Sequence, residues 1–159
     1  VKTLITYYSY SGITEKVVNI FTCLLSKKGD ITVQRLRPKK EITTFIGQCR
    51  AAFTRQSTEI EDGIKFDASP YDLVMIGLPV WAFAPTPAVN TYLDKVSGLT
   101  AKKVIVLLTS GSGAGVGKCF GNIEHVLKSK GASSVEKVNI PNRMMGDEKF
   151  IVSSLEKVL

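Results

Sequence analysis

Apolar residues occur along this chain in two alternating patterns: short continuous runs, and longer segments with helical spacing. Lys2–Tyr8, Asp72–Gly77 and Lys103–Leu108 are apolar nearly throughout, as parallel strands covered on both faces are. Ile31–Leu36 alternates apolar and polar residues, which indicates a strand near the edge of a sheet. Val135–Ile140 predicts a fifth strand.

The segments between these runs place apolar residues three and four positions apart, the period of an amphipathic helix. The first helix is expected over Ile13–Lys28, where Gly29 would end it. The other helices are expected after Thr43 or Thr44, after Pro85 and Pro87, from the end of Ser110–Gly117 to about Lys130, and after Asp147.

Because strands alternate with helices and every connection is a crossover, the sequence predicts an α/β fold with a doubly wound, five-stranded parallel sheet. A chain of 159 residues fits one domain, residues 1–159. Such sheets bind ligands beyond the carboxyl ends of their strands. Three unusual segments each follow a strand, so we expect them to converge there: Ser9–Thr14, Leu78–Ala84 and Ser110–Gly117.

The first of these segments is a hydroxyl-rich loop, Ser9-Tyr-Ser-Gly-Ile-Thr14, that leads directly into a helix. Its backbone N–H groups and the positive end of the helix dipole favour an anion such as phosphate. No lysine lies in the loop, so neutral donors would hold that phosphate. The alternative is that Ser9, Ser11 and Thr14 only cap the helix, but three hydroxyls beside Gly12 exceed what capping needs.

Two neighbours of the phosphate-binding residues are less informative. Tyr10 either covers a ligand or faces solvent. Glu15 suits the first turn of a helix, where acidic residues are common, and we expect it to be matched to the dipole and to face solvent.

The second segment carries Trp81, the only tryptophan, and Phe83 in a loop at a strand end. There Trp81 either stacks on a planar ligand or packs against the following helix. The third segment is rich in glycine, which lets backbone approach a flat ligand closely. It is not a nucleotide-binding P-loop, which would need glycine at Ser112 and a hydroxyl at Cys119.

These motifs together resemble the short-chain flavodoxins over essentially the whole chain. Ser9-x-Ser11-Gly12-x-Thr14 matches the phosphate loop of that family. Gly77-x-Pro79-Val80-Trp81, followed by Pro87-Ala88-Val89-x-x-Tyr92-Leu93, resembles the segment that flanks its flavin ring, and Thr109–Gly113 resembles its second flavin-contacting loop. The resemblance implies strand order 2-1-3-4-5 and FMN as cofactor. It also implies these cofactor-binding residues: Ser9, Tyr10, Ser11, Gly12, Ile13, Thr14, Pro79, Val80, Trp81, Ala82, Phe83, Ser110, Gly111, Ser112 and Gly113.

Charge and composition refine this expectation. The formal net charge is +7, whereas the low-potential carriers of the family are acidic, so we expect a higher reduction potential and acidic redox partner proteins. A basic tract, Arg35 to Lys40 with Arg50 and Arg55, lacks the motif or aromatic platform of a nucleic-acid site. Three widely spaced cysteines, no apolar run of about 18 residues and no signal-peptide pattern indicate a cytoplasmic protein without a membrane segment.

The leading functional interpretation is an FMN-binding electron-transfer protein without a catalytic side chain or metal site. The alternative is an FMN-dependent NAD(P)H oxidoreductase of the quinone-reductase type. A phosphoacceptor signalling domain shares the fold but needs acidic residues where this chain has Tyr8, Ser9 and Gly77. A flavodoxin-like protein that has lost its cofactor is a fourth hypothesis, which the intact phosphate loop opposes.

Overall fold

The computed structural model describes residues 1–159 and contains a five-stranded sheet in the order β2-β1-β3-β4-β5. All four strand pairs are parallel. The strands are β1 (Thr3–Tyr7), β2 (Ile31–Arg35), β3 (Leu73–Pro79), β4 (Lys103–Ser110) and β5 (Ser134–Pro141). The predicted fold class and strand order are confirmed.

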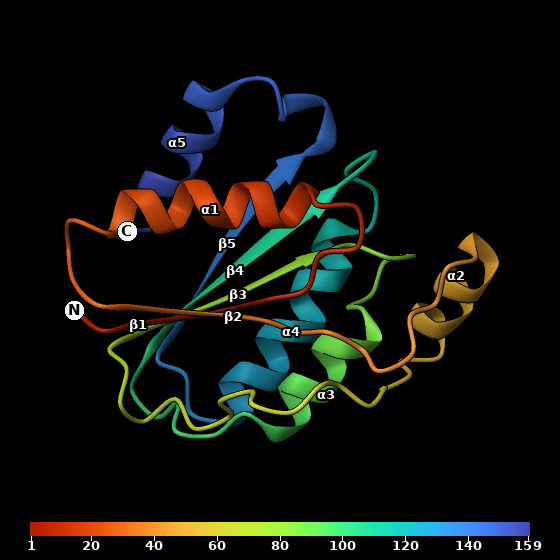
Figure 1. Cartoon of the computed structure of the whole chain (residues 1–159), viewed down its shortest axis with the longest axis horizontal. Coiled ribbons are helices and arrows are strands. Elements are labelled where there is room, and N and C mark those ends of the chain that lie inside the picture. The colour runs from red at the N-terminus through yellow and green to blue at the C-terminus, as the bar shows by residue number, and fades with distance from the viewer.

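Helices lie on both faces of this sheet (Figure 1). One face carries α1 (Ile13–Leu25) and α5 (Glu148–Glu156), and the other carries α3 (Pro87–Lys95) and α4 (Val116–Ser129). A short 3₁₀ helix, η1 (Asn142–Met144), leads from β5 towards α5. In Figure 1, α2 (Phe45–Phe53) stands apart from both layers, on the side towards which the strands point. None of these helices combines the length and the apolar character that a membrane crossing requires.

The central strands are apolar throughout because alternate residues enter two separate cores. Leu4, Val74 and Val104 belong to the core beneath α3 and α4. Their neighbours Ile5, Met75 and Ile105 belong to the core beneath α1 and α5. All six side chains are fully buried, so a one-residue register shift would exchange the contents of the two cores.

Two of the predicted helix caps are present. The Thr44 hydroxyl accepts a hydrogen bond from the Gly47 N–H at 3.2 Å, and the Asp147 carboxylate accepts one from the Phe150 N–H at 2.9 Å. The first helix ends at Leu25, three residues before its predicted end, and residues 26–28 form a turn. There the Ser26 hydroxyl donates to the Cys23 carbonyl at 2.7 Å, an interaction that competes with helical bonding.

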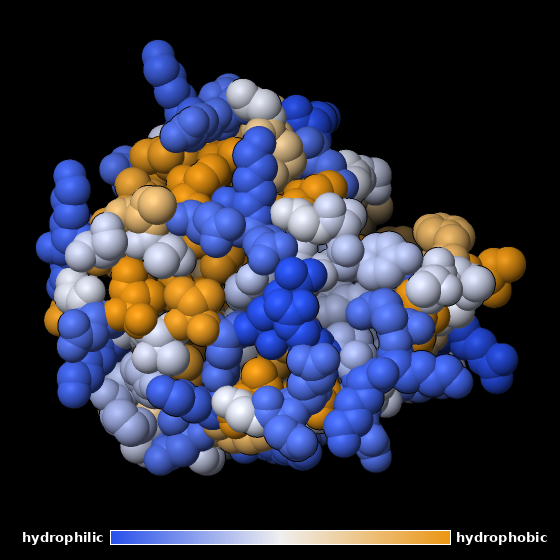
Figure 2. All heavy atoms as spheres, in the orientation of Figure 1, coloured by the Kyte–Doolittle hydropathy of each residue, from blue (hydrophilic) through white to orange (hydrophobic).

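The apolar face of α2 is largely uncovered. Only Ala51 and Ala52 of this helix are buried, whereas Phe45, Ile46 and Phe53 are 78%, 80% and 82% exposed. In Figure 2, hydrophobic atoms reach the surface at the right, where α2 projects, with hydrophilic side chains beside them.

Candidate functional site

The predicted loops do converge at the carboxyl edge of the sheet. β1, β3 and β4 are adjacent strands, so the segments that follow them start side by side. The hydroxyl oxygens of Thr14 and Thr109 lie 2.8 Å apart and join the first loop to the end of β4. An added Cβ at Gly77 would lie 3.2 Å from Tyr7 Cβ and 3.3 Å from Val18 Cγ2. Glycine therefore lets α1 pack closely against the centre of the sheet.

The first loop offers a set of unpaired backbone donors. Gly12 is the N-cap of α1 with φ of 87°, a left-handed conformation that glycine adopts without strain, and as a glycine it has no side chain of its own to cap the helix. The N–H groups of Ser11, Gly12, Ile13 and Thr14 donate to no protein acceptor. This row of donors at the positive end of a 13-residue helix suits a phosphate.

The three hydroxyls of this loop play different parts. Ser9 is buried, and its oxygen accepts from the Glu15 N–H at 3.3 Å, so it does contribute to capping. Thr14 is also buried and is engaged with Thr109. Ser11 alone is exposed. The hydrogen-bond donors that remain available to a ligand are therefore mainly backbone N–H groups, together with the hydroxyl of Ser11.

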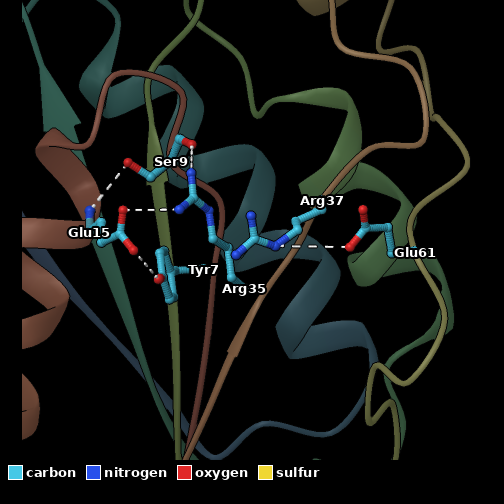
Figure 3. A network of polar contacts seen from close by, with 6 residues as sticks. All are labelled: Tyr7, Ser9, Glu15, Arg35, Arg37 and Glu61. Carbon is cyan, nitrogen blue, oxygen red and sulfur yellow. Dashed lines mark hydrogen bonds and ion pairs between the residues drawn. The ribbon is translucent and has the colours of Figure 1, made fainter.

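Figure 3 shows a polar network behind this loop that sequence reasoning missed. Glu15 accepts the Tyr7 hydroxyl at 3.0 Å and pairs with the Arg35 guanidinium at 3.0 Å. Arg35 also donates to the Ser9 carbonyl at 2.9 Å. Glu15 is thus an ion-pair partner with a side chain 35% exposed, and the expectation that it simply faces solvent is wrong. Burial, and then the bond to Glu15, raise the pKa of Tyr7.

One sequence signal pointed towards this network. Arg35 is the last residue of β2, and it lies opposite Tyr7 in the parallel register with β1. A charged residue at that strand end is placed beside the loop that follows β1. The resemblance already implied that β2 lies beside β1, but the pairing of Arg35 with Glu15 depends on side-chain geometry that only the structure gives.

The second loop forms a tight turn at Trp81–Ala84. The Trp81 and Ala84 N–H groups donate to each other's carbonyl oxygens at 3.2 and 2.9 Å. The two central residues, Ala82 and Phe83, have φ of 43° and 69°. Two consecutive left-handed residues that are not glycine indicate a strained backbone. The turn contains no glycine, the residue that would adopt this conformation without strain.

Trp81 contacts two tyrosines, one directly after β1 and one in the first loop. Its ring centroid lies 5.7 Å from that of Tyr8 and 6.1 Å from that of Tyr10, both edge to face. Tyr10 is 44% exposed, and its hydroxyl donates to the Thr43 carbonyl at 3.4 Å. The Tyr8 hydroxyl donates to Glu41, and burial raises its pKa. Trp81 therefore joins the first and second loops and stays partly exposed.

The third loop borders open space. An added Cβ at Gly111 or Gly113 would meet no protein atom within 4 Å. At Gly115 the same atom would lie 2.1 Å from Cδ1 of Phe83, so the second loop rests on the third. Ser110 is buried, and its hydroxyl donates to the Asn139 side chain at 3.1 Å, whereas Ser112 is exposed. The exposed glycine backbone leaves room for a flat ligand.

A family model described as flavodoxin matches residues 2–147. The chain belongs to the flavodoxin family. Membership confirms the resemblance that the loop motifs carried, and with it FMN as the cofactor and electron transfer as the function. The unpaired donors of the phosphate loop and the open glycine backbone fit such a cofactor. The sequence has no significant match among curated proteins.

Solved structures share the flavodoxin fold. A flavoprotein in complex with FMN from Lactobacillus acidophilus is 24% identical, with 86% of this chain and 92% of that chain covered and a TM-score of 0.70. Oxidised flavodoxin 1 from Bacillus cereus is 17% identical, over 99% and 94% of the two chains, with a TM-score of 0.67. An azoreductase from Bacillus anthracis is 16% identical, over 99% and 96%, with a TM-score of 0.61.

The structure divides the predicted basic tract into paired and unpaired cations. Arg35 pairs with Glu15, Arg37 lies 3.9 Å from Glu61 (Figure 3), and Lys39 lies 3.6 Å from Glu59. Lys40, Arg50 and Arg55 have no carboxylate partner, and the two arginines lie on α2 and just after it. Two of the three unpaired cations of the tract therefore lie at α2.

Proposed function

We propose that this chain holds FMN across its three strand-end loops and passes electrons between redox partner proteins. The observation that carries the proposal is the row of unpaired N–H groups from Ser11 to Thr14 at the start of α1. A terminal phosphate satisfies such donors, and FMN ends in one. When bound, FMN supplies the redox chemistry, since the flavin ring accepts and releases the electrons.

The side chains then have the work of binding, orientation and exclusion of water. Ser11 and the N–H groups that follow it would hold the phosphate, while Ser9 and Thr14 hold the loop in place. Trp81 and its neighbours, Pro79 to Phe83, would line one side of the ring, and Ser110 to Gly113 the other. Because no residue of the chain has to exchange a proton with a substrate, no acid or base is assigned.

The net charge of +7 supports acidic partners and a raised reduction potential. A positive protein stabilises an electron added to its cofactor, and it attracts acidic proteins mainly by speeding their association. An acidic cytochrome should therefore accept electrons faster than a basic one of similar potential. Its rate should fall as salt rises to physiological strength, where screening acts over about 8 Å. A rate that climbs with salt would contradict the assignment of acidic partners.

We also place this electron transfer in the cytoplasm. Cys23, Cys49 and Cys119 are all free, as cysteines are in a reducing compartment.

The cofactor is tested by purifying the protein, denaturing it and identifying the released flavin by chromatography. We expect FMN, and the FMN-free protein should take up FMN more tightly than riboflavin. Release of FAD, or failure to take up any flavin, would overturn the proposed function. The alternative oxidoreductase function is tested separately: a carrier with FMN should oxidise NAD(P)H slowly unless a reductase is supplied. Rapid turnover with NAD(P)H and a quinone alone would favour the enzyme.

A further inference from the structure

A groove of about 560 Å³ lies between α2, the first turns of α4 and the Trp81–Ala84 turn. This volume is within the range of small-molecule binding sites. Ile46, Cys49 and Phe53 of α2 form one apolar wall, and Ala82 and Phe83 form another. The groove thus shares a turn with the candidate flavin site but contains no residue of the phosphate loop.

The apolar walls have no partner in this chain. Ile46 and Phe53 are 80% and 82% exposed, and Phe83 is 52% exposed. Large apolar side chains that gather in a concave place mark a binding surface more often than scattered ones do.

All the charge in the groove is positive. Arg50, Arg55 and Lys118 line it, no carboxylate does, and none of the three is in an ion pair. Arg55 donates to the Asn122 side chain at 3.3 Å, which links the end of α2 to α4 across the groove. An occupant that combines an apolar body with an anionic group would satisfy both kinds of wall.

We propose that this groove binds a small aromatic anion, a planar molecule that carries a sulfonate, carboxylate or phosphate. The volume fits one such molecule, and the exposed rings of Phe53 and Phe83 offer it apolar contact. The three cations give it a charge partner. Ala82 and Phe83 belong both to this groove and to the candidate flavin site, so an occupant of the groove would lie beside the cofactor. That position next to FMN rests on the proposed function. Binding itself does not depend on FMN.

The probe is anthraquinone-2-sulfonate, with the uncharged anthraquinone-2-sulfonamide as its matched control. Each is titrated into the FMN-loaded and the FMN-free protein by calorimetry, and the site is mapped by amide chemical shifts. We expect one sulfonate per chain in both forms, shifts centred on α2 and the start of α4, and binding of the sulfonamide weaker by about tenfold.

Substitutions of groove residues, each with a matched substitution outside the groove, test whether the probe binds there. Phe53→Ala should weaken the binding of anthraquinone-2-sulfonate by about tenfold, because it removes an aromatic ring from the wall of the groove. Phe45→Ala is the matched control: Phe45 is 78% exposed on the same helix but does not line the groove, so affinity should not change. Lys118→Gln should weaken binding by about threefold, and Lys149→Gln on α5 should not.

Equal binding of the sulfonate and the sulfonamide, or equal effects of Phe53→Ala and Phe45→Ala, would overturn the proposal. So would displacement of the probe by FMN, since the groove would then be part of the flavin site. If poly-L-glutamate shifts the groove residues and anthraquinone-2-sulfonate does not, the groove is a protein-docking face and the proposal is wrong. Failure of FMN binding would overturn the proposed function alone, because the titration of FMN-free protein still decides the groove.

Discussion

The Nη1 atom of Arg35 lies 3.0 Å from Oε2 of Glu15, so a partly buried ion pair stands directly behind the phosphate loop. Their side chains are 27% and 35% exposed. The pair is neutral as a whole, and a phosphate bound at the start of α1 would meet little net charge from it. When one member of the pair is removed, the charge of the other is left unbalanced beside the phosphate.

Glu15→Gln should therefore tighten FMN binding, and Arg35→Gln should weaken it. Loss of the carboxylate leaves a guanidinium beside the loop, whereas loss of the guanidinium leaves an unpaired carboxylate. We expect changes of about 1 kcal/mol in opposite directions at low salt. Titrations followed by flavin fluorescence measure both.

Riboflavin, which lacks the phosphate, provides the control for this pair. Its affinity should respond much less to either substitution. Arg37→Gln is the matched variant, because Arg37 pairs with Glu61 at 3.9 Å on a more exposed surface. Changes of the same sign for the two members, or equal changes for riboflavin and FMN, would show that the pair acts by holding the loop rather than by charge.

Local sequence patterns record the strands of this region but not its ion pair. The apolar runs predicted the strands because Leu4 and Ile5 must enter different cores, and a pattern along the chain records that directly. The Arg35–Glu15 pair depends on which strands are neighbours, which no local pattern records. For α2, the spacing of Ile46 and Phe53 predicted an apolar face, but periodicity does not tell what covers that face. The structure leaves it open.

Cys119 provides a pH-dependent contribution to stability. Its side chain is fully buried in α4, and burial raises the pKa of the thiol from about 9 to about 12. Because the folded pKa is the higher one, the contribution is complete below pH 9 and is lost as pH rises towards 12. The loss should approach about 1.4 kcal/mol per pH unit within that window.

Urea denaturation at a series of pH values checks this effect. The free energy of unfolding of Cys119→Ala should fall less steeply above pH 9 than that of the natural protein. Cys23→Ala is the matched control, because it removes a cysteine that is exposed on α1 rather than buried. Identical slopes for all three proteins would show that Cys119 does not titrate differently in the folded state.

Trp81 tests the position of the flavin ring. If Trp81 stacks on the flavin, its fluorescence should be quenched when FMN is added. Trp81→Ala should then weaken the binding of FMN by roughly 1–3 kcal/mol, the range that aromatic stacking on bases contributes. Tyr10→Ala removes the other exposed ring of the cluster, 6.1 Å away, and serves for comparison. Unchanged FMN affinity in Trp81→Ala would assign this residue to packing against Tyr8 and Tyr10.

The strained turn beside Trp81 gives a prediction with an internal control. Ala82 and Ala101 are both alanines with positive φ, 43° and 62°, and only Ala82 lies at the candidate flavin site. Glycine adopts this conformation without strain, so Ala82→Gly and Ala101→Gly should each stabilise the protein by about 1 kcal/mol. Urea denaturation of the FMN-free proteins measures that gain.

The two variants should differ once FMN is present. Glycine at position 82 loosens a turn that the cofactor needs in one conformation, and the cost of ordering it should weaken FMN binding by about threefold. Ala101 lies just before β4, at the opposite edge of the sheet, so Ala101→Gly should leave FMN affinity unchanged. If both variants bind FMN like the natural protein, the strain at Ala82 and Phe83 has no part in holding the cofactor. If Ala82→Gly binds it more tightly, the strained turn opposes binding, and the bound state relieves it.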